Sequence, residues 1–150
     1  MLIENIVAHG GEIDLGGREI DRLEIEWFEA NKPVLRKQTA RGDDVAIRFV
    51  KQSQRLRQGD VLFLDGHKAI VVEIRPCDAI RIRPSTLLEM GLACYEIGNK
   101  HLPTFIQHDA VLLPYEEPIF KWLQGKGFKA ERVVTQLLDP INSTVTPHSH

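Results

Sequence analysis

The sequence predicts an α+β protein: an N-terminal all-β domain, then a ferredoxin-like βαββαβ domain with a flexible C-terminal tail. Three observations support this. Apolar and polar residues alternate through much of residues 1–75, and no segment there has helical spacing. Residues 76–139 combine strand-like with helix-like periods. Residues 140–150 contain few side chains that a core could bury, as expected of a flexible tail.

The first domain, residues 1–75, is expected to consist of strands. The predicted strands are residues 20–27, 45–49, 61–64 and 69–74. In the first of them, Leu23, Ile25 and Trp27 share one face, which is the pattern of a half-buried strand. Asp65-Gly66-His67-Lys68 separates the last two, and an Asp-Gly pair between apolar runs is a strong hairpin signal because both turn positions tolerate positive φ.

The second domain is expected to alternate strands with helices. The predicted order is strand 79–83, helix 86–99, strands 104–107 and 111–113, helix 116–124 and strand 128–137. Thr86 and Glu89 are spaced as a capping box, and Gly98-Asn99 is a plausible end for the same helix. Because each domain has a small core, burial of further surface in a homodimer through the second domain is expected.

Charge and composition exclude several classes of protein. The chain has 150 residues with 19 Lys and Arg against 21 Asp and Glu, whereas nucleic-acid binders usually carry a basic excess. No apolar run approaches the roughly 18 to 20 residues of a membrane helix, and no signal peptide is visible. Cys77 and Cys94 cannot form a disulfide framework. We therefore expect a cytoplasmic protein that binds neither nucleic acid nor membrane.

Catalytic motifs are absent from the sequence. There is no Gly-x-Ser-x-Gly elbow, phosphate-binding loop or Gly-x-Gly-x-x-Gly fingerprint. Neighbouring carboxylates occur at 43–44 and 116–117, in a turn and at a helix start, where acids commonly serve the helix dipole. The sequence therefore predicts no catalytic residue, no organic cofactor and no enzyme.

Histidine offers the more informative signal. His101 follows a glycine-capped helix and precedes Pro103 and a strand, which would fix its backbone and leave one ring edge open. The alternative is a surface histidine favoured by the helix dipole. His148 and His150 form a His-x-His pair on the tail that can chelate a metal. Imidazole binds zinc, copper, nickel and iron, so these residues alone do not name the metal.

The segment Gly98-Asn99-Lys100-His101 resembles the Gly-Asn-x-His motif of the UreE-type urease accessory proteins, which are nickel metallochaperones. The segment 55–62 resembles the family's first domain where it leads into the hairpin. The resemblance implies a homodimer in which His101 of both chains binds one metal ion, with His148 and His150 as added ligands. Nickel would be the metal delivered for urease active-site assembly, and zinc or copper can bind the same site in vitro.

The resemblance also implies contacts with the urease apoprotein complex and its GTPase accessory protein. This chain departs from the family pattern in places. Lys100 replaces a commoner arginine, and Glu96 replaces a histidine found in some members. With only His148 and His150 in the tail, delivery is expected rather than bulk storage. His108, in the predicted turn after His101, is a candidate auxiliary ligand.

A basic stretch in the first domain has two interpretations. Its members are Arg36, Lys37, Arg41, Arg48, Lys51, Arg55 and Arg57. They either lie on solvated strand faces or dock the domain onto an acidic partner. The main alternative function is a metal-independent protein–protein adaptor whose β domain binds a peptide. An RNA-associated maturation factor is disfavoured by the formal charge of -2, and a hydrolase by the missing nucleophile.

Overall fold

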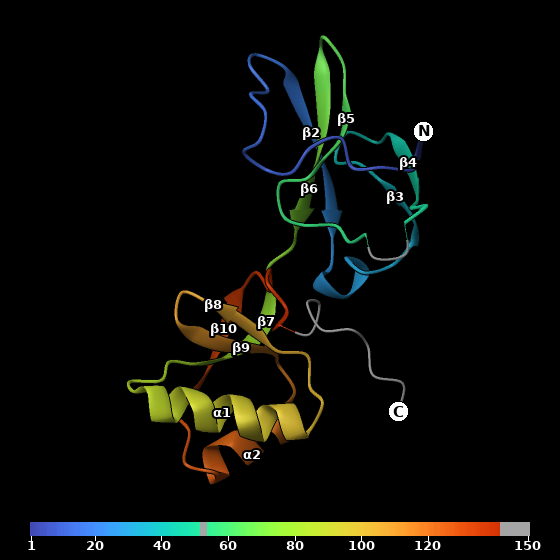
Figure 1. Ribbon diagram of the computed structural model, residues 1–150. Coiled ribbons are helices and arrows are strands. Elements are labelled where there is room, and N and C mark those ends of the chain that lie inside the picture. Colours follow the sequence, from blue (N-terminus) through green and yellow to red (C-terminus); the bar gives the residue numbers. More distant parts are fainter. Residues whose placement is uncertain (52–53, 142–150) are drawn as a thin grey trace. The chain divides into compact units, whose positions relative to one another are not determined.

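The computed structural model describes residues 1–51 and 54–141, which form two compact units divided after Arg75. The α+β class predicted from the sequence is confirmed, with only sheets and a single short 3-10 helix described in the first unit and a sheet with two helices in the second. Figure 1 shows both units. Within the described ranges, no helix has the length and apolar character needed to cross a membrane.

The first unit contains two three-stranded sheets, with strand orders β1-β4-β3 and β2-β6-β5. The strands are β1 (Leu2–Ile3), β2 (Glu19–Ile25), β3 (Val34–Gln38), β4 (Asp44–Arg48), β5 (Val61–Leu64) and β6 (Lys68–Ile74). Strand β1 runs parallel to β4 and β2 parallel to β6, whereas the other pairs are antiparallel.

Strand β6 forms the centre of its sheet, and the sequence explains why. It reads as a continuous apolar run, as expected of a strand buried on both faces. Ala69 and Val71 pack with Ala8 and Val61 in one cluster, while Ile70 and the other alternate residues are also fully buried. The hairpin predicted between β5 and β6 is confirmed.

The prediction of a strand over 20–27 is wrong at its end, because β2 stops at Ile25 and a 3-10 helix, η1 (Trp27–Glu29), follows. The Glu29 carboxylate accepts the N–H of Glu26 at 2.9 Å, which turns the chain there. Strands β1 and β3 were not predicted. Strand β3 buries only Leu35, so its alternation is too weak to detect.

The second unit has the ferredoxin-like fold predicted for it. Its elements are β7 (Cys77–Ile82), α1 (Leu87–Asn99), β8 (Phe105–Gln107), β9 (Ala110–Pro114), α2 (Glu117–Gly125) and β10 (Ala130–Thr135). The sheet is antiparallel with order β10-β7-β9-β8, and both helices cover one of its faces (Figure 1). The core between them is formed by Ile80, Ile82, Ile97, Val111, Leu113 and Leu123.

Helix α1 begins close to where the sequence places it. The Thr86 hydroxyl accepts the N–H of Glu89 at 3.1 Å, which is an N-cap hydrogen bond. The Glu89 carboxylate in turn accepts the N–H of Ser85 at 2.7 Å, and this hydrogen bond helps to lower the pKa of Glu89. These caps fix the start of the helix whose far end leads to His101.

Candidate metal centre

His101 lies immediately beyond the C-terminal end of α1, in an uncommon backbone conformation. Its N–H donates to the carbonyl of Gly98 at 3.0 Å, and its φ is 55°, in the left-handed region. Helices often end on such a residue, but glycine usually occupies it because a side chain there costs about 1 kcal/mol or more. The chain thus holds an exposed histidine where glycine would be less costly.

The residues after His101 fix its backbone from the other side. Leu102 packs against the core beneath the helices. Thr104 is buried and its hydroxyl donates to the carbonyl of Leu102 at 2.9 Å, and Phe105 then starts β8 as a buried residue. Because packing holds the chain both before and after it, His101 is presented from a rigid position.

The charged neighbours of His101 are directed to α2. The Lys100 ammonium lies 4.5 Å from the centre of the Trp122 ring, which is a cation–π contact. The Glu96 carboxylate lies 3.7 Å from the ammonium of Lys126. Lys100 and Glu96 are therefore both engaged within the unit.

The outward face of α1 is apolar. Leu88, Leu92 and Tyr95 lie at positions i, i+4 and i+7, and their exposed fractions are 72%, 48% and 66%. The inward face is formed by other residues, including Ala93 and Ile97, which are fully buried. Large exposed apolar side chains on one helix face are typical of an interaction surface.

The C-terminal segment returns across the sheet to β8. Leu137 is buried, and the side-chain amide of Gln107 donates to the carbonyl of Gln136 at 3.0 Å. The oxygen of the same amide accepts the N–H of Leu138 at 2.6 Å. A single glutamine therefore holds both sides of Leu137 and fixes the path of this segment.

This path ends beside the residues that follow His101. Pro140 forms a β-bridge with Phe105, and the N–H of Ile141 donates to the carbonyl of Thr104 at 3.0 Å. Pro140 and Ile141 were assigned to the flexible tail but pair with the fold. His148 and His150 lie outside the described residues.

No complete metal site is formed by the described part of one chain. Residues 1–51 and 54–141 contain no group of three or more His, Cys, Asp or Glu side chains placed to hold a metal. His108 forms a hairpin turn with Asp109, with φ values of 51° and 62°, at the far end of β8 from His101. A metal bound at His101 would need ligands from outside the described residues of its own chain.

Comparison with known proteins decides the family. Residues 3–75 match the model of the N-terminal domain of the UreE urease accessory protein, and residues 77–150 match that of its C-terminal domain. The chain belongs to the UreE family of urease accessory proteins. A family of accessory proteins agrees with the prediction that the chain is not an enzyme.

Relatives described as urease accessory protein UreE match over most of their length. The protein from Flavobacterium johnsoniae is 55% identical over 150 residues, which cover 100% of this chain and 91% of the relative. That from Haemophilus influenzae (strain PittEE) is 44% identical over 144 residues, covering 91% and 78%. That from Acetivibrio thermocellus is 37% identical over 150 residues, covering 100% and 97%.

One histidine contact in this UreE-family chain has no signal in the sequence. The Nδ1 atom of His9 lies 2.8 Å from a carboxylate oxygen of Asp60, which is fully buried. The other oxygen of Asp60 accepts the N–H of Arg57 at 2.8 Å. Ala8 forms a bridge with Val61, so this contact ties the N-terminal segment to the start of β5. Fifty-one positions separate the two residues, and no motif joins them.

Cys94 is part of the helix packing, as expected from its place in the sequence. It is partly buried against the core, and its thiol lies 3.8 Å from the sulfur of Met90. Burial raises the pKa of the Cys94 thiol. Because only the thiolate binds metal well, this change makes Cys94 a poor ligand.

Proposed function

We propose that this UreE-family chain is a nickel-binding metallochaperone that delivers nickel for urease active-site assembly. In this proposal one nickel ion is held between the subunits of a homodimer by His101 of each chain, with help from His148 and His150. The observation that carries it is the exposed, conformationally constrained His101 in a chain whose described residues offer it no cluster of further ligands. Membership of the urease accessory family supports urease as the destination.

The apolar face of α1 supports the dimer. In a two-fold symmetric dimer, a residue close to the axis meets its own copy. Leu88, Leu92 and Tyr95 lead along α1 towards His101, so a two-fold axis near the C-terminal end of the helix would bury apolar side chains and bring two imidazoles together. One histidine per chain then supplies two ligands.

The anchored C-terminal segment supports a contribution from the tail. Ile141 is hydrogen-bonded to Thr104, three residues from His101. His148 and His150 are seven and nine positions beyond Ile141 in the sequence. Because an extended chain covers at most about 3.3–3.6 Å per residue, they are tethered within about 25 Å and about 32 Å of this anchor. The tether raises their effective concentration near His101.

Nitrogen ligands suit a metal that must be released. Four thiolates form a closed structural site, whereas a few imidazoles and water leave positions open for an acceptor. Neutral imidazole binds nickel, copper and zinc, and copper binds most tightly in the general order of affinities. Zinc or copper is therefore expected to occupy the same site in vitro.

The proposal includes the partners and place of the delivery. The urease apoprotein complex and its GTPase accessory protein would receive the homodimer and its nickel in the cytoplasm. The first unit would contact the partner, and the second unit would dimerise and hold the metal. The alternative is a metal-independent adaptor that uses the same first unit.

Isothermal titration with nickel tests the metal site. We expect His101→Ala to abolish shared binding, and deletion of residues 142–150 to weaken binding or lower its stoichiometry. The truncated chain keeps Ile141 and its bond to Thr104, so the loss would report the tail alone. Equal nickel uptake by wild type and His101→Ala would contradict the proposal, and absence of uptake by wild type would favour the adaptor.

A further inference from the structure

The first unit neutralises many of its cations internally. Among its described residues, the Lys and Arg side chains in ion pairs form Arg22–Glu73, Lys37–Glu29, Arg41–Glu19, Lys68–Asp43 and Arg75–Glu26. Arg36 and Arg48 differ, because no ion pair or side-chain hydrogen bond joins either of them to another described residue. The basic stretch seen in the sequence therefore separates into paired members and at least two whose charge is available to another molecule.

Arg36 and Arg48 project from the same face of the β1-β4-β3 sheet. Arg36 is opposite Ala46 in the register of β3 and β4, and Arg48 is opposite Val34. Side chains alternate between the two faces of a sheet, and the intervening residues Leu35 and Ile47 are buried. The face that carries both arginines is consequently the outer face of this sheet.

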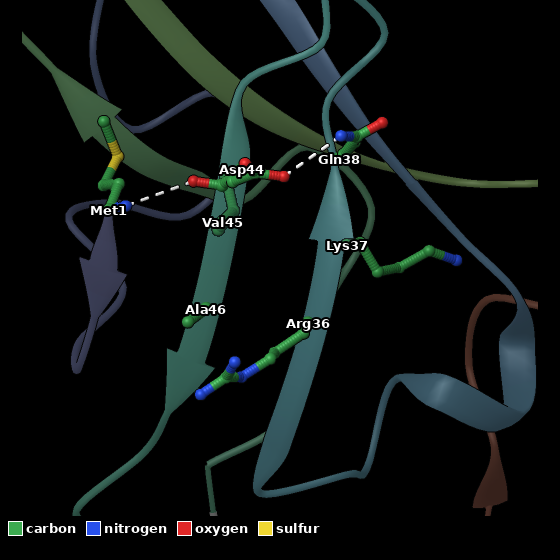
Figure 2. A pocket seen from close by; sticks show the side chains of 7 residues that line it. All are labelled: Met1, Arg36, Lys37, Gln38, Asp44, Val45 and Ala46. Atoms are coloured by element: carbon green, nitrogen blue, oxygen red, sulfur yellow. Dashed lines mark hydrogen bonds between the residues drawn. The ribbon is translucent and has the colours of Figure 1, made fainter.

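Apolar side chains surround the two arginines. Leu2 of β1 is paired with Ala46 of β4 and is 58% exposed, and Val34 of β3 is 61% exposed. Figure 2 shows the guanidinium of Arg36 extending across β4 beside Ala46, at a shallow cavity of about 570 Å³. The same cavity is lined by Met1, Lys37, Gln38, Asp44 and Val45.

This combination fits one kind of occupant. In an antiparallel pair, the positions of diagonal neighbours such as Arg36 and Arg48 are about 7–8 Å apart at the backbone. The two like-charged side chains therefore start close together on one face, where they repel each other, and a bound carboxylate would relieve the repulsion. Guanidinium groups bind carboxylates in a bidentate manner, and apolar side chains around them exclude water and strengthen the contact.

We propose that the outer face of the β1-β4-β3 sheet docks an acidic segment of a partner protein, in which a carboxylate is flanked by apolar side chains. Nucleic acid and anionic membranes fit less well, because they are bound by extended basic surfaces, whereas here Arg36 and Arg48 lie among exposed apolar side chains such as Leu2 and Val34. The proposal concerns the first unit and does not depend on nickel binding.

Selection from a random peptide library on the immobilised full-length chain tests the proposal. We expect the selected peptides to be enriched in Asp or Glu next to Leu, Val or Phe. Their affinity for the double variant Arg36→Gln/Arg48→Gln should fall roughly 100-fold, about tenfold for each charged hydrogen bond lost. Binding should also weaken in high salt.

A second double variant, Arg57→Gln/Arg83→Gln, is the matched control, because it removes the same charge from exposed positions elsewhere. It should bind the selected peptides like wild type. Selection without acidic enrichment, or equal binding to the Arg36→Gln/Arg48→Gln variant, would overturn the proposal. The proposal would also be overturned if the Arg36→Gln/Arg48→Gln variant bound the peptides normally but lost self-association or binding to a DNA duplex.

Discussion

The two units use histidine in opposite ways. In the first unit, His9 contacts the buried carboxylate of Asp60, and the contact joins two segments of the fold. In the second unit, His101 lies exposed in a left-handed conformation that a glycine would adopt at lower cost. A histidine's surroundings, rather than its presence, therefore distinguish the structural role of His9 from the ligand role proposed for His101.

The exposed surfaces of the two units also differ, in the charge of their side chains. The first unit offers cations, Arg36 and Arg48, within an apolar face, which suits a partner of opposite charge. The second offers apolar side chains along α1 and little charge among them, which suits a second copy of the same surface. Each of the following experiments changes a residue or a condition in one of the two units and tests the role assigned to it.

The largest effect is expected at His101. Both His101→Gly and His101→Ala should abolish nickel binding, because each removes the imidazole. Glycine adopts positive φ without strain, so the glycine variant should be more stable than the alanine variant by about 1 kcal/mol. Nickel titration and thermal unfolding measure the two effects. Nickel binding by the glycine variant would show that the backbone at this position, and not the ring, matters.

The next effect is expected at the outward face of α1. Leu92→Lys should weaken the homodimer by about 2 kcal/mol, as is typical for an apolar anchor at the centre of an interface. Sedimentation equilibrium measures it. Val134→Lys is the control, because Val134 is exposed on β10 of the same unit. Equal dissociation constants for the two variants would place the interface elsewhere.

A comparable but purely structural effect is expected at His9. His9→Ala should destabilise the chain by about 1–3 kcal/mol, since the buried carboxylate of Asp60 loses a partner. Nickel binding should be unchanged. His67→Ala, in an exposed turn, should alter stability by no more than about 0.5 kcal/mol. Denaturant unfolding compares them, and loss of nickel binding in His9→Ala would contradict the structural role.

The smallest effect on stability is expected at Glu29 when the pH is lowered. Burial acts to raise the pKa of Glu29, but the hydrogen bond from the Glu26 N–H and the Lys37 ammonium outweigh it and lower that pKa below the ordinary value of 4.5. The ionised group therefore contributes stability above pH 4.5, and this stability is lost as the pH falls through the lowered pKa. Glu29→Gln should lose less stability than wild type on acidification, whereas identical pH profiles would contradict this.

Local patterns predicted the elements of the second unit well. Capping by Thr86 placed the start of α1 within a residue, and the order of strands and helices predicted the fold. Gly98 was expected to cap the far end, but it lies inside α1, and Lys100 and His101 end the helix instead. The same patterns did not identify the face of α1 that packs inward. Leu88, Leu92 and Tyr95 have helical spacing but are exposed. Helical spacing shows that side chains share one face of a helix, but it does not show whether another part of the protein buries that face.

Turn chemistry shows a similar limit. Asp65-Gly66 predicted a hairpin correctly, but that glycine does not adopt positive φ, and the Asp65 carboxylate instead accepts the N–H groups of Lys68 and His67. Within residues 1–51 and 54–141, two successive non-glycine residues with positive φ occur at His108-Asp109, a turn that contains no glycine. Different residue types can form the same short turn, so an Asp-Gly pair predicts a turn without fixing its backbone angles.

The candidate site was predictable only in its local part. The position of His101 after the helix follows from neighbouring residues. The anchoring of Ile141 to Thr104 depends on contacts between segments far apart in the sequence, and the same is true of the His9–Asp60 contact. Ligands from a second subunit leave no spacing in one chain, so only the family resemblance suggested them.

Native mass spectrometry of the untagged full-length chain with nickel tests the shared site most directly. We predict a dimer that carries one ion bound between its two chains, and a His101→Gly dimer that carries none there. Nickel bound equally well by monomers, or retained between the subunits of the His101→Gly dimer, would contradict it.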